Sequence, residues 1–251
     1  MEHLNQSDAN SHDIVADNID KLKAIFPEAF TEGKVDFNKL KGALGDYVET
    51  REERYNFSWA GKSKARRLAQ TPTTGTLRPC PEESVDWDKT ENLFIEGDNL
   101  EVLKLLQKSY QGKIGAIYID PPYNTGKDFV YRDSYGDNLK NYLEITRQVD
   151  GDGQKVSSHI EKAGRFHSDW LNMIYPRLIL SKNLLKEDGV IFCSIDDGEV
   201  SRLRTIMDDI FGEENFLAQF SWKTDGNFDN QAKVKFCHEY ILLYALSLIH
   251  I

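Results

Sequence analysis

The apolar segment 114–119 ends abruptly in Asp120-Pro121-Pro122-Tyr123, and this junction constrains the fold more than any other feature of the chain. A short run rich in Ile, followed by turn residues, predicts a buried strand. The two prolines fix two φ angles and remove two N–H groups, so nearby carbonyl groups stay able to accept hydrogen bonds. A plain Asp-Pro turn is the simpler interpretation. We favour a functional one, because α/β sheets bind ligands at the carboxyl ends of their strands.

The turn combines hydrogen-bond acceptors with a flat aromatic ring. The Asp120 carboxylate and the local carbonyl groups accept hydrogen bonds, and Tyr123 offers an apolar face beside them. Such an array suits a planar group that bears an exocyclic amine. The residue types therefore point to a nucleobase as the ligand.

Patterns typical of strands and helices alternate from residue 93 to residue 246. Short apolar runs predict strands, and apolar residues three or four positions apart predict helices. This alternation predicts a parallel α/β sheet with helices on both faces. The predicted strands are 93–96, 114–119, 190–195, 216–222 and 240–246.

The region before this alternation has a different pattern. It predicts two short amphipathic helices, near residues 19–26 and 37–48. Segment 71–81 contains three prolines and predicts an extended connector. We therefore expect three parts: a mostly helical N-terminal extension with its connector (1–88), an α/β domain (89–246) and an unrelated end (247–251).

Composition predicts a soluble, cytoplasmic, globular protein. Hydrophobic residues make up 40% and charged residues 29% of the 251 residues, and no apolar run is long enough to span a bilayer. The polar start of the chain lacks the features of a secretory signal. Cys80, Cys193 and Cys237 lie far apart without a Cys-x-x-Cys pair, which predicts reduced thiols and no metal site.

The net charge of −10 counts against a simple nucleic-acid binder, because phosphate contacts need Lys and Arg. A local basic face can nevertheless dock a duplex while the rest of the surface stays acidic. Lys62, Lys64, Arg66 and Arg67 form the densest basic cluster and are the predicted DNA-binding residues. A solvated helix surface explains the same cluster equally well, so composition leaves both interpretations open.

Residues 120–126, with the sequence DPPYNTG, resemble the catalytic motif of amino-group DNA methyltransferases. The acidic first position is similar to that of adenine-N6 enzymes and, less often, cytosine-N4 enzymes. Further segments between about residues 54 and 245 resemble the modification subunits of type III restriction–modification systems. These segments are GKSKA at 61–65, TGTL at 74–77, NLFIEGDNL at 92–100, FHSDWL at 166–171 and SIDD at 194–197.

This resemblance implies transfer of a methyl group from S-adenosyl-L-methionine to adenine N6 in DNA. It implies a Rossmann-like methyltransferase sheet, of which this chain would hold the catalytic half within 89–246. Double-stranded DNA would be the substrate. The implied partners are a second copy in a homodimer and a restriction subunit with helicase and endonuclease activity.

The resemblance also assigns catalytic roles to Asp120, Pro121, Pro122 and Tyr123. Adenine must leave the duplex stack to reach an enzyme pocket, and stacking on Tyr123 would recover part of that cost. The Asp120 carboxylate and the Pro121 carbonyl would accept the two N–H bonds of the amine. They would direct its lone pair at the methyl group and stabilise the positive charge that develops on nitrogen.

The predicted cofactor-binding residues are Asp98, Asn124, Thr125 and Asp196. Asp98 follows a predicted strand and starts a helix, so a helix cap is an equal alternative to a pocket role. Asn124 and Thr125 would shape the loop after the catalytic motif. Asp196 and its neighbour Asp197 end a strand at the same sheet edge, which makes both candidates for the pocket.

Four further residues have competing interpretations. His167 and Trp170 resemble positions that line the site, although a Trp near a helix start is more often part of a core. His238 and Glu239 lead into the last predicted strand, and a structural role is favoured for both.

A Gly-rich turn between a strand and a helix, which enzymes of this kind use to approach the cofactor, is missing from the sequence. In the related class the motif order is permuted, and this turn comes near the C-terminus. We therefore expect a truncated product. The alternatives are a catalytically inactive fragment, a cytosine-N4 DNA methyltransferase, a methyltransferase of glutamine or RNA guanine, and a module unrelated to methylation.

Overall fold

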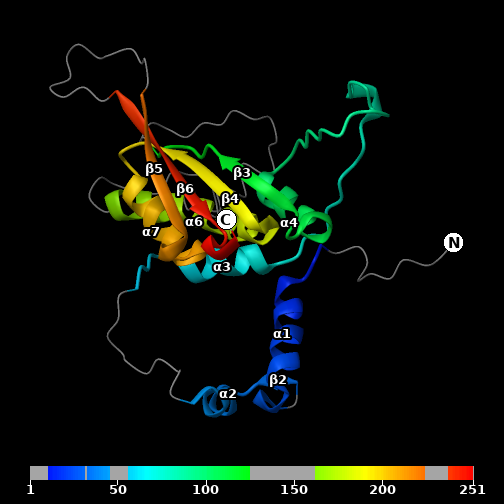
Figure 1. Ribbon diagram of the computed structural model, residues 1–251, viewed down its shortest axis with the longest axis vertical. Coiled ribbons are helices and arrows are strands. Elements are labelled where there is room, and N and C mark those ends of the chain that lie inside the picture. Colours follow the sequence, from blue (N-terminus) through cyan, green and yellow to red (C-terminus); the bar gives the residue numbers. More distant parts are fainter. Residues whose placement is uncertain (1–10, 32, 46–55, 125–161, 224–236, 251) are drawn as a thin grey trace, which may run out of the picture.

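The computed structural model describes residues 11–31, 33–45, 56–124, 162–223 and 237–250. Figure 1 shows a body in which helices pack against a four-stranded sheet, and a small helical arm that extends from this body. The fold is mixed α/β, as the sequence predicts.

The arm consists of two capped helices joined by a small hairpin. The side chains of Asp13 and Asp36 accept hydrogen bonds from backbone N–H groups in the first turns, which helices leave without partners. The two helices agree with the sequence prediction in place but not in bounds, and the hairpin was not predicted. The elements are α1 (Ile14–Ile25), the 3-10 helix η2 (Pro27–Ala29), β1 (Phe30–Thr31), β2 (Lys34–Val35) and α2 (Phe37–Leu44).

The sheet of the body has the strand order β3-β4-β6-β5. β3 and β4 run parallel, whereas β6 pairs antiparallel with both β4 and β5. The expectation of an all-parallel sheet is therefore wrong. A parallel pair needs a crossover, usually a helix, and the sequence between the last two strands shows no helical period. The strands are β3 (Ile114–Ile119), β4 (Leu185–Ile195), β5 (Phe216–Lys223) and β6 (His238–Ala245).

The strand predicted over 93–96 does not form. This segment has no strand pairing in the described structure, and Leu93 and Phe94 are 70% and 93% exposed. Their apolar side chains favour a strand locally, but a strand is stable only with a partner, and the described residues supply none.

Four helices pack on one face of the sheet. The side chains of Ile191, Cys193 and Ile195 alternate along β4 and are all fully buried against them. α6 lies at the centre of this layer, and α3, α4 and α7 contact it. The helices are α3 (Lys62–Gln70), α4 (Asn99–Tyr110), α6 (Lys162–Leu184) and α7 (Val200–Phe211), with 3-10 turns η4 (Pro81–Glu83), η5 (Glu213–Asn215) and η6 (Leu248–His250).

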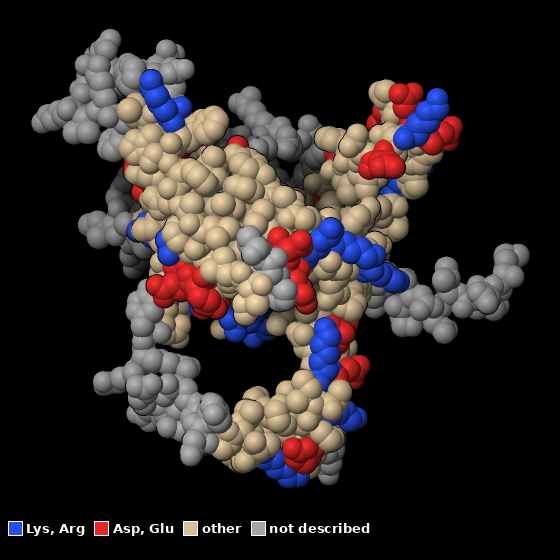
Figure 2. Space-filling model, in the orientation of Figure 1, with Lys and Arg blue, Asp and Glu red and all other residues tan. Residues whose placement is uncertain are grey.

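The opposite face of the sheet carries no helix among the described residues, so the prediction of helices on both faces is wrong for them. Tyr118 and Trp222 are each 61% exposed there, and Phe220 is also exposed. Figure 2 shows a broad area without Lys, Arg, Asp or Glu over these strands. This face is apolar, and no helix of the described ranges covers it.

α3 belongs to the body although it lies within the predicted N-terminal extension. Its Ala65 and Ala69 are buried, and small side chains at these positions let α3 pack closely on α6. The division into 1–88, 89–246 and 247–251 stays a prediction. Within the described part of the chain, no helix combines the length and apolarity needed to cross a membrane.

Leu178 on α6 tests this core. It is fully buried, so Leu178→Ala leaves a cavity and should lower the free energy of unfolding by about 2–5 kcal/mol. Urea denaturation followed by circular dichroism measures the change. Leu93→Ala removes the same atoms from an exposed position and should stay within about 0.5 kcal/mol of the parent. Equal losses in both variants would contradict the described core.

Candidate active site

The parallel pairing of β3 and β4 brings their carboxyl ends to the same edge of the sheet. In this register Ile119 lies opposite Cys193, so the residues that follow each strand are neighbours. β6 runs the other way and starts at this edge, where Tyr240 pairs with Ile195. The 120–123 turn, the end of β4 and the start of β6 therefore meet, as expected for a ligand site in an α/β sheet.

The Asp120 carboxylate is exposed but held in one orientation. Its Oδ1 accepts a hydrogen bond from the buried Ser194 hydroxyl at 2.6 Å. Its Oδ2 accepts none from the described residues. Ser194 lies in the SIDD segment, but no local pattern indicates that its side chain orients Asp120, because the contact depends on strand register. The result is a fixed carboxylate with one oxygen open for a ligand.

The prolines of the turn are anchored from α6. Pro121 is buried, and the carbonyl of Pro122 accepts a hydrogen bond from the indole Nε1 of Trp170 at 2.6 Å. Trp170 is itself buried in the core, so it both packs and holds the turn. No described residue donates to the Pro121 carbonyl, the oxygen that the sequence analysis assigns to the amine.

The Tyr123 ring packs against the core, and its hydroxyl donates to Glu239 Oε2 at 3.2 Å. Burial raises the pKa of Tyr123 to about 12, and the nearby carboxylates of Asp120 and Glu239 act in the same direction. The phenol is therefore neutral, with its ring held by packing and its hydroxyl held by Glu239. Glu239, which the sequence analysis treats as structural, supports the turn through this contact.

Asn124 ends the described part of this loop with a φ of +58°, in the left-handed region. Its Nδ2 donates to Glu199 Oε1 at 2.6 Å, and His167 Nδ1 contacts the same carboxylate oxygen. Sequence reasoning missed Glu199. The only available signal was its place between a strand end and a helix start. Thr125, a predicted cofactor-binding residue, lies outside the described residues.

The remaining acids of the predicted pocket make local hydrogen bonds. Asp98 caps α4 by accepting from the backbone N–H of Glu101 at 3.0 Å, and Asp196 accepts from that of Gly198 at 2.9 Å. Each keeps a second carboxylate oxygen that accepts no hydrogen bond from the described residues. The cap interpretation of Asp98 therefore holds, and its role toward a cofactor stays a prediction.

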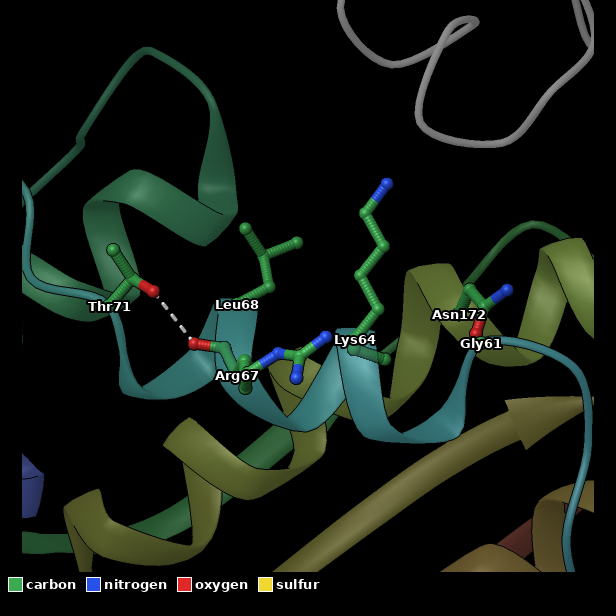
Figure 3. A pocket seen from close by; sticks show the side chains of 7 residues that line it. Gly61, Lys64, Arg67, Leu68, Thr71 and Asn172 are labelled. Carbon is green, nitrogen blue, oxygen red and sulfur yellow. Dashed lines mark hydrogen bonds between the residues drawn. The ribbon is translucent and has the colours of Figure 1, made fainter.

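The four basic residues on α3 separate into two pairs. Lys62 forms an ion pair with Asp209 at 3.0 Å, and Arg66 donates to the Tyr175 hydroxyl at 3.0 Å, so both support the body of the protein. Lys64 and Arg67 are exposed and line a pocket of about 210 Å³. Figure 3 shows this pocket beside α3, with Asn172 next to Gly61 at one end of it. The predicted DNA contact therefore fits Lys64 and Arg67 better than it fits Lys62 and Arg66.

A family model described as DNA methylase matches residues 114–247, from the start of β3 to two residues beyond the end of β6. The chain belongs to this DNA methylase family. The match covers the strands that form the sheet and the turn with Asp120. The matched residues thus include the 120–124 loop and its neighbours, whereas Asp98 and the basic residues of α3 lie before the matched range.

Named relatives of this DNA methylase include modification subunits. The chain is 40% identical to the type III restriction–modification enzyme EcoP15I Mod subunit of Escherichia coli, over 89% of this chain and 35% of that protein. It is 35% identical to the StyLTI Mod subunit of Salmonella typhimurium, over 90% of this chain and 37% of that protein. The resemblance to type III modification subunits is confirmed. The chain spans about a third of the length of these relatives.

A solved structure, the PvuII DNA methyltransferase (cytosine-N4-specific), is 12% identical to this DNA methylase. It aligns with a TM-score of 0.34 over 58% of this chain and 47% of the other.

The pKa of Tyr123, which burial raises, predicts a pH dependence of stability. An ordinary tyrosine ionises near pH 10, whereas the folded protein holds this proton up to about pH 12. The folded state thus binds the proton more tightly than the unfolded state. The resulting stability is present below about pH 10 and is lost as the pH rises through about 12.

Urea unfolding at several pH values between about 9 and 12 measures this loss. Tyr123→Phe should show a shallower decline than the parent over this interval, whereas Tyr110→Phe, a control on α4, should keep the parent slope. A Tyr123→Phe curve parallel to the parent curve would show that the phenol titrates as an ordinary tyrosine.

Proposed function

We propose that the protein methylates adenine N6 in double-stranded DNA, as the modification component of a type III restriction–modification system. The observation that carries this proposal is the fixed Asp120 carboxylate, held by Ser194 at 2.6 Å at the carboxyl end of β3. Family membership gives the reaction class, and this geometry supports the specific role of the turn.

The turn presents two acceptors to the two N–H bonds of an exocyclic amine. These are the Asp120 oxygen that Ser194 leaves open and the Pro121 carbonyl, to which no described residue donates. An amine held by both is favoured in a pyramidal form, with its lone pair directed away from the ring. The same acceptors stabilise the positive charge that develops on nitrogen, and their fixed orientation keeps the cost of reorganisation small.

Tyr123 supplies the surface on which the target base stacks. Extruding a base from the duplex costs a few kcal/mol, and stacking on an aromatic ring recovers about 1–3 kcal/mol. The hydrogen bond from Tyr123 to Glu239 fixes the ring before the base arrives, so less freedom is lost on binding.

S-adenosyl-L-methionine is the proposed cofactor, and it supplies a methyl group on a positively charged sulfur. The open carboxylate oxygens of Asp98 and Asp196 fit a ligand that carries amino and hydroxyl donors. We propose that Asp98 and Asp196 hold such donors, together with Asn124 and Thr125. The function of this chain is then to bind and orient, while the cofactor provides the leaving group.

The proposed partners follow from the proposed reaction. Double-stranded DNA is the substrate, and the exposed pair Lys64 and Arg67 on α3 is its proposed backbone contact. A second copy of the protein and a restriction subunit with helicase and endonuclease activity are the proposed protein partners. Cellular DNA lies in the cytoplasm of bacteria, which is the proposed location.

Asp120→Ala tests the central assignment. Loss of the preorganised carboxylate should lower methyl transfer by about 100- to 1,000-fold without changing the melting temperature. Mass spectrometry of hydrolysed DNA measures N6-methyladenine and separates it from N4-methylcytosine, the alternative product. Asp188→Ala removes an exposed acid at the other end of β4 and should keep full activity. Retained turnover in Asp120→Ala would reject the assignment.

The same assay on the 251-residue chain addresses the inactive-fragment alternative, because methylation by this chain alone would exclude it.

Lys64→Gln combined with Arg67→Gln tests the DNA contact. Each lost phosphate contact lowers the slope of log K against log salt by about one, so the double variant should lower it by about two. Fluorescence anisotropy with a labelled duplex at several salt concentrations gives the slope. Lys21→Gln combined with Lys23→Gln removes two exposed charges from α1 and should leave the slope unchanged. An unchanged slope in the α3 variant would exclude these residues from the DNA contact.

A further inference from the structure

Glu199 has an unusual environment for a glutamate. It precedes α7 directly, yet its side chain makes no capping hydrogen bond to that helix. Only 1% of its surface is exposed. Burying a carboxylate is costly unless partners compensate for the lost water. The residues that contact the Glu199 carboxylate therefore indicate its role.

These partners come from three different parts of the fold. Oε1 accepts a hydrogen bond from Asn124 Nδ2 at 2.6 Å and contacts His167 Nδ1 on α6. Arg202 on α7 lies 3.6 Å from Oε2, which is buried and accepts no hydrogen bond in the described structure. A single carboxylate thus joins the loop after β3, the first part of α6 and the start of α7.

The contact to Asn124 falls where the catalytic loop needs support. Asn124 follows Tyr123 directly and adopts a left-handed backbone, with a φ of +58°. Non-glycine residues rarely occupy this region, and Asn tolerates it better than most. The hydrogen bond to Glu199 holds the side chain while the backbone takes this conformation. It therefore fixes where the 120–123 turn ends.

The contact to His167 supports the same turn from a second direction. His167 and Trp170 are one helical turn apart on α6, so they lie on the same side of that helix. Trp170 holds the Pro122 carbonyl at 2.6 Å. Glu199 thus fixes the end of the turn through Asn124 and the helix that holds its middle through His167.

We propose that Glu199 is a positioning residue for methyl transfer, which acts through Asn124 and His167 and does not touch the substrate. The inference rests on the proposed function and deepens it, because it names a buried charge that sets where Asp120 and the Pro121 carbonyl stand. A displacement of about 1 Å at a reacting centre can cost about 100-fold in rate. Loss of the Glu199 contacts should therefore lower the rate even though Glu199 does not contact the base.

Glu199→Gln separates a positioning role from an effect on stability. The amide has nearly the same shape but no charge, and one of its two terminal groups donates instead of accepting. We expect kcat to fall by about 10- to 100-fold, while KM for S-adenosyl-L-methionine and for DNA changes little. Glu213→Gln, an exposed control in η5, should behave as the parent. A variant with unchanged kcat, or with a kcat that falls only in proportion to unfolded protein, would overturn the proposal.

Asn124→Gly provides a second test, because it removes the same contact from its other partner. Glycine accepts the left-handed backbone, so the substitution removes the side-chain contact without straining the chain. If Glu199 acts partly through Asn124, the two changes should be less than additive in log kcat, because both remove the same contact. Full additivity would show that the residues act independently and would overturn the proposal.

A spectroscopic measurement distinguishes failure of this inference from failure of the proposed function. With 5-fluorotryptophan incorporated, the 19F signal of Trp170 is identified by its loss in Trp170→Phe. Glu199→Gln should shift this signal, and Glu213→Gln should not. If Glu199→Gln shifts the signal but the parent protein methylates no DNA, the proposed function is refuted and the positioning role stands. If the parent protein methylates DNA but Glu199→Gln leaves the signal unmoved, the positioning role alone is refuted.

Discussion

The candidate site depends on the parallel register of β3 and β4. This register sets Ile119 opposite Cys193, and it therefore brings the Ser194 hydroxyl within 2.6 Å of the Asp120 carboxylate. A shift by one residue would turn every side chain of β4 to the other face of the sheet. Ile191, Cys193 and Ile195 are buried against the helices, so burial of these side chains opposes any such shift. Core packing and site geometry thus have the same cause.

The 120–124 loop is held by four neighbours, each from a different segment. The side chains of these neighbours form hydrogen bonds with four of the five loop residues: Ser194 with Asp120, Trp170 with Pro122, Glu239 with Tyr123 and Glu199 with Asn124. A hydrogen bond to a charged group contributes about 1.5–3 kcal/mol and a neutral one about 1 kcal/mol. Together these contacts are strong enough to fix a loop whose prolines lack N–H groups of their own. The acceptors that they leave open are the ones assigned to the amine.

The fold differs from the sequence prediction where pairing between distant segments decides the outcome. The strands at β3, β4, β5 and β6 were predicted from local apolar patterns, but these patterns carry no information on strand direction. The segment 93–96 has the same kind of pattern but forms no strand among the described residues, and its Leu93 and Phe94 are exposed. No described helix covers the face with Tyr118 and Trp222, and the local pattern could not show this, since an apolar pattern predicts burial but not what covers it.

The sequence by itself determined the strand that stops at Asp120, the acceptors and ring that follow it, and the family to which these residues point. It could do so because proline geometry and residue chemistry are local properties. Only the tertiary structure decided that Lys62 pairs with Asp209 and that Glu199 reaches Asn124. These partners lie far apart in the chain. Their contact follows from how helices and strands pack, which no local pattern encodes.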